Sequence, residues 1–245
     1  MPIISRRRDV AVGAEGWPVT AGLWALYLAD NPNNTLTGDP SNQITQMWDE
    51  SGNTRHATGN ETWEPTGLST SKPCLNATGT RLQIDGGSNL TTSKVSVFWV
   101  GQCSSSTLQI GISGNLNSAI SLSWTVDGNS PFVSNNAGGT IVQGVSPLTY
   151  FTDYTDSVAR SVAFLYDDTP NVRTMYVSGV KTNEDGDTGW SGTPAGAFVF
   201  KNVMGGNEAP TNRLAALAIY EAKILSASEI TELHNYVKNT LGLVA

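Results

Sequence analysis

The sequence predicts an all-β fold in which two antiparallel sheets pack face to face as a sandwich. Short segments with a period of two recur along the chain and are rich in aromatic and β-branched residues. Turn clusters such as Asp127-Gly128-Asn129 and Gly205-Gly206-Asn207 separate these segments. Only 14% of the residues are charged, which is typical of strands joined by polar turns and not of helices with ion-paired faces.

One domain with an N-terminal extension accounts for the 245 residues, because all-β domains often reach this length undivided. We predict an extended arm over residues 1–19 and the sandwich over residues 20–245, since no linker-like stretch divides the chain. The arm carries Arg6, Arg7 and Arg8, which we expect to dock on an anionic partner surface. The alternative is a solvated tip at a terminus.

The first strong strand is predicted at residues 23–29 and ends in the turn residues 30–34. A second strand, residues 44–48, leads into the turn Asp49-Glu50-Ser51-Gly52-Asn53. The polar, proline-bearing stretch 58–73 is expected to be a surface loop.

The middle of the chain shows the alternation most clearly. Residues 95–100 are apolar on both faces, which predicts a central strand covered on both sides, and residues 120–126 predict a half-buried strand. Further strands are expected at residues 109–112, 161–166, 174–177, 197–201 and 214–220.

A short amphipathic helix is predicted at the C-terminus. Ser226 is placed to cap it, and Glu229, three residues later, completes a capping box. Apolar residues then recur at helical spacing before a glycine that favours a left-handed helix end: Ile230, Leu233, Val237, Leu241 and Gly242. We expect this apolar stripe to press on the sandwich.

Three segments carry a family resemblance. They are Trp48-Asp49-Glu50-Ser51-Gly52-Asn53, Met175-Tyr176-Val177-Ser178-Gly179, and Ile219-Tyr220 followed by Leu225-Ser226-Ala227-Ser228-Glu229. In this order they resemble the laminin-G-like branch of the concanavalin A-like lectin and glucanase jelly rolls, over residues 20–243. The resemblance implies a two-sheet jelly-roll sandwich, a fold that hosts lectins, glycosidases, adhesion modules and virion proteins. The turn at Asp49 is expected to be structural, because Asp and Ser can bond their own backbone and Gly52 permits a positive φ.

No catalytic group is predicted. The glucanases of this fold place their acids at alternate positions of a strand, in a Glu-x-Asp-x-Glu arrangement, and this run is missing from the sequence. The nearest acidic groups, Glu61 with Glu64 and the run 184–187, fall in segments that read as turns. The two histidines, His56 and His234, are expected to be packing residues, so we predict a non-enzyme, with a glycosidase as the less favoured reading.

The sequence is compatible with two kinds of ligand site, one for a sugar and one for calcium. Exposed aromatic platforms for a sugar are nominated at Trp63, Trp124 and Trp190, whereas tryptophans within apolar runs are assigned to the core: Trp24, Trp48 and Trp99. No cofactor is required, but calcium is a candidate at Asp185 and Asp187, where oxygen ligands alternate around a glycine. Rival acidic clusters lie at Asp153 with Asp156 and at Asp167 with Asp168.

Charge and hydropathy limit the partners. The net charge is −7, and three of the 14 basic residues are in the arm, so the body repels phosphate backbones and nucleic-acid binding is not expected. No apolar run is long enough to cross a membrane.

Residues 9–16 do not form the apolar core of a signal peptide, which predicts synthesis in a cytoplasm. Cys74 and Cys103 are therefore expected to be free thiols, with a disulfide as the alternative.

Together these features favour a non-catalytic virion protein of a tailed phage, either a capsid decoration protein or a tail-fibre or spike component. We expect it to be a homo-oligomer that contacts other virion proteins, with a host-surface glycan as a further ligand. The alternative is a carbohydrate-binding lectin or adhesin module, located in the cytoplasm or on an extracellular surface.

Overall fold

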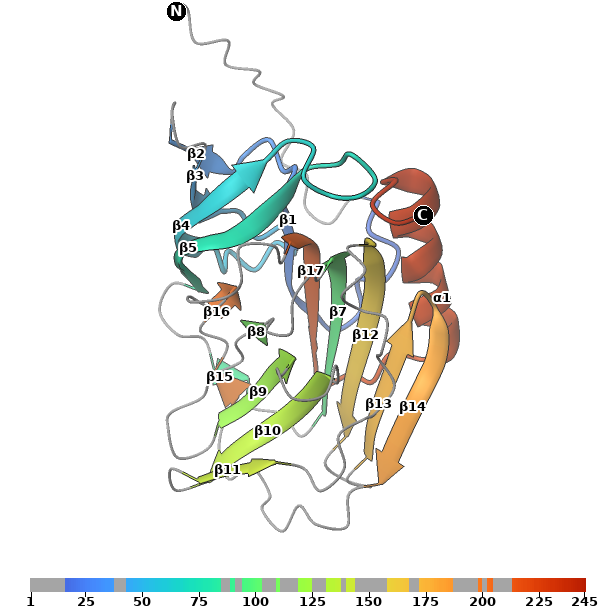
Figure 1. Ribbon diagram of the computed structural model, residues 1–245. Helices are drawn as coiled ribbons and strands as arrows, with labels where there is room; N and C mark the ends of the chain where they lie inside the picture. The colour runs from blue at the N-terminus through green and yellow to red at the C-terminus, as the bar shows by residue number, and fades with distance from the viewer. Residues whose placement is uncertain are drawn as a thin grey trace, which may run out of the picture.

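The computed structural model confirms an antiparallel all-β sandwich with one C-terminal helix (Figure 1). It describes residues 16–37, 43–84, 89–90, 94–102, 109–110, 119–124, 131–137, 140–143, 158–167, 172–186, 198–199, 202–204 and 213–245.

The described strands are β1 (Leu23–Leu28), β2 (Thr35–Leu36), β3 (Gln43–Met47), β4 (Ala57–Glu64), β5 (Cys74–Ile84), β6 (Asn89–Leu90), β7 (Lys94–Gln102), β8 (Gln109–Ile110), β9 (Ala119–Trp124), β10 (Pro131–Ala137), β11 (Thr140–Gln143), β12 (Arg160–Asp167), β13 (Val172–Val177), β14 (Val180–Gly186), β15 (Phe198–Val199), β16 (Asn202–Met204) and β17 (Arg213–Glu221). The largest sheet has the order β14-β13-β12-β7-β17-β5-β4-β3-β2, with β1 paired to β17 and β16 paired to β5. The strands β11-β10-β9-β8 form a second sheet, and β15 pairs with β6.

The large sheet branches at β17. One edge of this strand pairs with β7 along its whole length. The other edge pairs with β5 at Arg213 and Leu214 and with β1 from Ala216 onward. A bulge between Leu214 and Ala216 accompanies the change of partner. The branch brings β1 and β17, which are far apart in the sequence, side by side.

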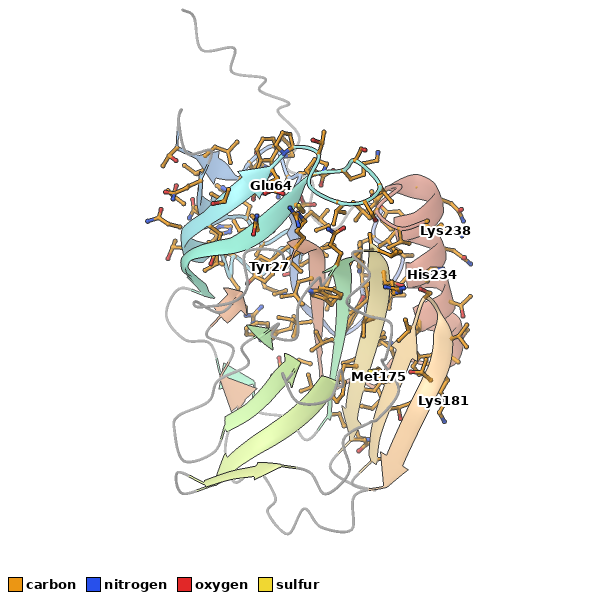
Figure 2. The ribbon with its side chains drawn as sticks, viewed as in Figure 1. Tyr27, Glu64, Met175, Lys181, His234 and Lys238 are labelled. Atoms are coloured by element: carbon orange, nitrogen blue, oxygen red, sulfur yellow. The ribbon has the colours of Figure 1, made fainter. Side chains whose placement is uncertain are left out.

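Both faces of the central strands are buried, as the apolar run 95–100 predicts. Val97 and Trp99 of β7 enter one core, whereas Phe98 and Val100 enter the other. On the helix side, β17 presents the small residues Ala215, Ala216 and Ala218, which allow the helix to approach closely. Figure 2 shows His234 on the helix side of the sheet.

The predicted helix is confirmed as α1 (Ala227–Asn235), which continues into the π-helical turn η1 (Tyr236–Thr240). The Ser226 hydroxyl accepts from the Glu229 N–H, and the Glu229 carboxylate accepts from the Ser226 N–H at 2.8 Å, which completes the capping box. His234 Nδ1 lies 2.8 Å from the Ser161 hydroxyl and docks α1 on β12. Burial, and then the charge of Lys238, lower the pKa of His234.

The end of the predicted arm packs on the sandwich. Trp17 Nε1 donates to the hydroxyl of Tyr220 at 2.9 Å, and that hydroxyl donates to the carbonyl of Val19. The Trp17 ring also meets Phe98 and Tyr236 edge-on. Arg6, Arg7 and Arg8 lie outside the described residues.

Two predictions about local structure are wrong. The stretch 58–73 is not a loop throughout, because β4 occupies residues 57–64 and pairs with both β3 and β5. Its polar composition misleads because β4 has bulges and several half-exposed side chains. The run 184–186 is likewise part of strand β14, paired with β13, and not a turn.

Candidate functional site

The turn that follows β3 is held by one buried carboxylate. Asp49 Oδ1 accepts from the backbone N–H groups of Leu26 and Ser51, both at 2.9 Å. Asp49 Oδ2 accepts from the hydroxyl of Ser51 at 2.9 Å and from the N–H of Arg55 at 3.0 Å. Gly52 has φ +85°, as the predicted turn requires. The structural role predicted for this turn is therefore confirmed.

The turn covers the second edge of β1, the edge that does not face β17. Leu26 donates to Asp49, the Glu50 N–H donates to the Leu26 carbonyl at 2.8 Å, and Tyr27 forms an isolated bridge with Asp49. The turn thus takes the place of a neighbouring strand and satisfies backbone groups that would otherwise be buried without partners.

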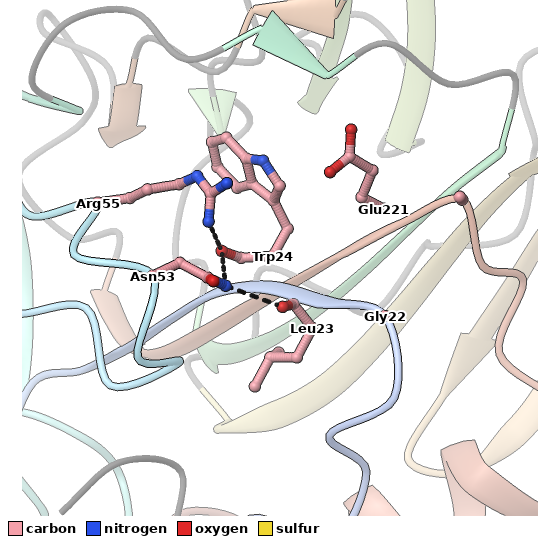
Figure 3. Close-up of a pocket in the computed structure, with 7 residues that line it drawn as sticks. Gly22, Leu23, Trp24, Asn53, Arg55 and Glu221 are labelled. Carbon is pink, nitrogen blue, oxygen red and sulfur yellow. Dashed lines mark hydrogen bonds between the residues drawn. The ribbon is translucent and has the colours of Figure 1, made fainter.

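A pocket opens where this turn meets the start of β1 and the end of β17. We call it the front pocket; it has a volume of about 450 Å³ and is lined by Gly22, Leu23, Trp24, Asn53, Arg55, Glu221 and Ala222 (Figure 3). Gly22 and Ala222 both have positive φ, +76° and +55°, so the backbone on both sides of the pocket bends sharply.

Arg55 is the best-placed polar group of the front pocket. Its guanidinium carbon lies 4.5 Å from the centre of the Trp24 ring, and its Nη1 donates to the Trp24 carbonyl at 2.8 Å (Figure 3). Among the described residues the structure gives the guanidinium no other acceptor. Its remaining N–H groups are available to a ligand.

Asn53 and Glu221 complete the polar lining. The amide nitrogen of Asn53 donates to the carbonyls of Leu23 at 3.2 Å and Trp24 at 3.0 Å, which fixes the side chain and leaves its oxygen as an acceptor. Glu221, half-buried at the end of β17, adds a carboxylate on the other side of the pocket. The pocket therefore combines donors, acceptors and a buried aromatic side chain.

The sequence did not nominate this pocket. Arg55 lies two residues after the predicted turn, and this position was the one available signal. The contribution of Gly22, Glu221 and Ala222 depends on the pairing of β1 with β17, which no local pattern reveals.

Of the three nominated tryptophans, the structure describes only the side chain of Trp63, which does not line the front pocket. Trp63 is half-buried against the core and donates from Nε1 to the Ala29 carbonyl at 2.9 Å, so it is not the exposed platform that we predicted. Trp124 is the last residue of β9, opposite Pro131, and its side chain lies outside the described residues. Trp190 also lies outside them.

Trp48 is not a core residue, contrary to the prediction, because its side chain is 38% exposed. Trp24 and Trp99 are buried as predicted. The apolar run that ends β3 misled the assignment, because Trp48 is already beyond the strand and turns outward.

The acidic clusters give no metal centre in the part of the chain that the structure describes. Asp185 is placed in β14, opposite Arg173, but its side chain and the whole of Asp187 lie outside the described residues. Calcium at these two residues therefore stays a prediction. Asp167 is engaged in an ion pair with Lys94 at 2.9 Å, while Asp153, Asp156 and Asp168 are outside the described ranges.

Glu61 and Glu64, the nominated acid pair, occupy structural positions in β4. Glu61 is fully buried in β4. Glu64 binds Arg213 at 2.8 Å and the amide of Asn76 at 2.7 Å, which ties β4 to β17 and β5. Neither carboxylate lines the front pocket.

The free cysteine of the described chain is inert. Cys74 is a buried, free thiol, as predicted. Burial, and then the negative charge of Glu64, raise the pKa of Cys74 to about 12. Cys103 lies outside the described residues.

No described helix is long and apolar enough to cross a membrane.

Glu50 gives the turn a pH dependence. Burial, and then the charges of Asp30 and Asp49, raise the pKa of Glu50 from its ordinary 4.5 to about 7. The folded state thus holds this proton more tightly than the unfolded chain, so the stability contributed by Glu50 falls as the pH rises from about 4.5 to about 7.

Glu50→Gln, which is neutral at every pH, should stabilise the protein at pH 8 by about 1–2 kcal/mol and by little at pH 4.5, where the folded forms of both proteins are uncharged at this position. Urea unfolding of both proteins across this pH range measures the difference. Glu232→Gln, on the exposed face of α1, is the control and should show no such trend. An equal gain at pH 4.5 and pH 8 would assign the effect to packing and not to ionisation.

Comparison with known proteins identifies the fold. No protein-family model matches the sequence, and no curated protein matches it either. Among solved structures, domain 4 of AbnA, a GH43 extracellular arabinanase from Geobacillus stearothermophilus in complex with arabinotriose, has a TM-score of 0.58 and 18% identity, over 87% of this chain and 98% of that one.

Toxin binding domains are similar at the same level. The binding domain of botulinum neurotoxin DC in complex with SialylT has a TM-score of 0.61 and 13% identity, over 90% of this chain. The same toxin domain in complex with rat synaptotagmin II has a TM-score of 0.59 and 14% identity. This chain spans about half the length of these toxin domains, 53% and 52%. At such identities the likeness shows the shared β-sandwich fold of binding domains.

Proposed function

We propose that this chain is a carbohydrate-binding module whose ligand occupies the front pocket. The observation that carries the proposal is the Arg55 guanidinium, which is stacked on Trp24 and has N–H groups that no described residue uses. A guanidinium held in this way is preorganised, so little rotamer entropy is lost when it binds a ligand.

The chemistry of the lining fits a polyhydroxylated ligand. Sugar hydroxyls both donate and accept, and the pocket offers donors from Arg55 and acceptors from Glu221 and from the Asn53 oxygen. The buried Trp24 side chain adds an apolar part to the lining, which suits the C–H groups of a sugar. Because one positive and one negative side chain line the pocket, it has no strong preference for a charged ligand.

The structural neighbours support this proposal at the level of the fold. One was solved with arabinotriose and another with SialylT, and both share the sandwich architecture with this chain. A fold alone does not carry a function, so the proposal depends on the residues of the front pocket.

A glycan array of the full chain, followed by calorimetry with the best oligosaccharide, tests the proposal. Arg55→Ala should weaken binding by about tenfold or more, because hydrogen bonds from a charged donor are lost. Arg160→Ala is the matched control, since Arg160 begins β12 at the end of the sheet remote from Glu221, and it should bind as the wild type does. Unchanged affinity in folded Arg55→Ala protein, or an array without any reproducible signal, would refute the proposal.

The location in a virion remains a second proposal, based on the arm and the jelly-roll resemblance in the sequence. Trp17 and Val19 pack on the sandwich and anchor the end of the predicted arm to it. Co-purification of the chain with a phage particle is the direct test. A lectin-like module on a virion would also bind host glycans, so the two proposals are compatible.

A further inference from the structure

The same turn that supplies Arg55 to the front pocket carries a pair of aromatic rings at its two ends. The rings of Trp48 and His56 lie 4.2 Å apart between centroids, tilted by 52°. Trp48 is 38% exposed, whereas Trp17, Trp24 and Trp99 are at most 5% exposed. Of the tryptophans whose side chains are described, Trp48 therefore presents the most surface to solvent.

Hydrogen bonds hold the backbone at Trp48 and the ring of His56. The backbone N–H of Trp48 donates to Asn34 Oδ1 at 2.9 Å, and the Asn34 amide donates to the carbonyl of Leu28 at 2.9 Å. His56 Nδ1 accepts the N–H of Asp49 at 3.1 Å. In the neutral ring the proton is thereby assigned to Nε2. The platform is therefore held by its own turn and by β1.

Two donors border this aromatic surface. Within the described ranges neither the Trp48 indole N–H nor the His56 Nε2–H meets an acceptor. A partly exposed indole ring flanked by N–H groups matches a sugar ring, which presents an apolar C–H face and equatorial hydroxyls. No carboxylate or cationic group of the turn is stacked on this surface, which favours a neutral sugar.

We infer that Trp48 and His56 form a second sugar-binding subsite, separate from the front pocket and specific for the face of a neutral sugar ring. Neither residue lines the front pocket, although Asn53 and Arg55 of the same turn do. The inference rests on the proposed carbohydrate-binding function, but it uses no residue of the front pocket. One turn would thus present two subsites to an oligosaccharide.

Nuclear magnetic resonance of the indole N–H groups tests the inference directly. The full, ¹⁵N-labelled chain is titrated with millimolar arabinotriose, cellotriose, maltotriose, triacetylchitotriose and lactose, and the Trp48 signal is assigned with Trp48→Phe. We expect at least one of these sugars to shift the Trp48 signal. Trp48→Ala should weaken binding of that sugar by about tenfold, and Trp48→Phe by about threefold or less, because the phenyl ring keeps the stacking surface.

Arg55→Ala separates the two sites. If its Trp48 signal still shifts with sugar, the subsite exists whatever the front pocket binds. If a sugar binds in an Arg55-dependent way while the Trp48 signal stays unmoved and Trp48→Ala binds normally, the front pocket stands and this inference is overturned. A Trp48 signal unmoved by all five sugars overturns it as well. Trp48 is exposed, so its replacement should not unfold the protein, and thermal unfolding checks this.

Discussion

Asp49→Ala should destabilise the protein by about 3–5 kcal/mol, which is a large share of the stability of a single domain. The carboxylate is buried and accepts four hydrogen bonds, three of them from the main-chain N–H groups of Leu26, Ser51 and Arg55. An alanine leaves those groups buried without acceptors, and water enters the edge of β1 only if the turn opens. Urea unfolding of the variant and the wild type measures the loss.

The same substitution should abolish binding at the front pocket, because Asn53 and Arg55 are positioned by this turn. Asp167→Ala is the matched control. Asp167 pairs with the partly exposed Lys94, so its removal should cost clearly less than the removal of Asp49. A loss at Asp49 as small as that at Asp167 would show that the turn does not hold the edge of β1.

The turn and the helix were predictable because each is specified by neighbouring residues. Asp49, Ser51 and Gly52 meet the hydrogen-bonding and φ requirements of the turn within four residues, and Ser226 with Glu229 does the same for the helix start. The central position of β7 could also be predicted, because a strand that is apolar on both faces must be covered on both faces.

The front pocket was not predictable, because its walls come from residues about two hundred positions apart. Gly22 and Glu221 meet only through the pairing of β1 with β17, which begins after the bulge between Leu214 and Ala216. A bulge has no reliable pattern in a single sequence. The exposure of Trp48 was predicted wrongly for another reason. One residue separates a buried strand position from an outward-facing one, and periodicity does not locate the end of a strand to within one residue.

The polar strand β4 shows the limit of composition. Its sequence reads as a loop, yet Glu64 reaches Arg213 of β17 and Asn76 of β5. Ion pairs and amide contacts of this kind take the place of an apolar alternation, and they become visible only when three strands are assembled.

Gly101→Ala should be at least as damaging as the loss of Asp49, with an expected destabilisation of about 3–5 kcal/mol and poor recovery of folded protein. Gly101 lies in β7 opposite Leu214, beside the bulge of β17. A Cβ atom there would collide with the backbone carbonyl oxygen of Arg213 and with the ring of Trp99. Circular dichroism and urea unfolding measure the effect.

Gly52→Ala is the matched control, because the two glycines are needed for different reasons. Gly52 has φ +85° but open space around the position of a Cβ atom, so alanine there should cost only about 1 kcal/mol of backbone strain. Gly101 supplies space between two central strands, and neither a backbone oxygen of β17 nor the fully packed Trp99 ring can yield without moving the sheet. Equal losses for the two variants would mean that β7 and β17 can separate at the bulge.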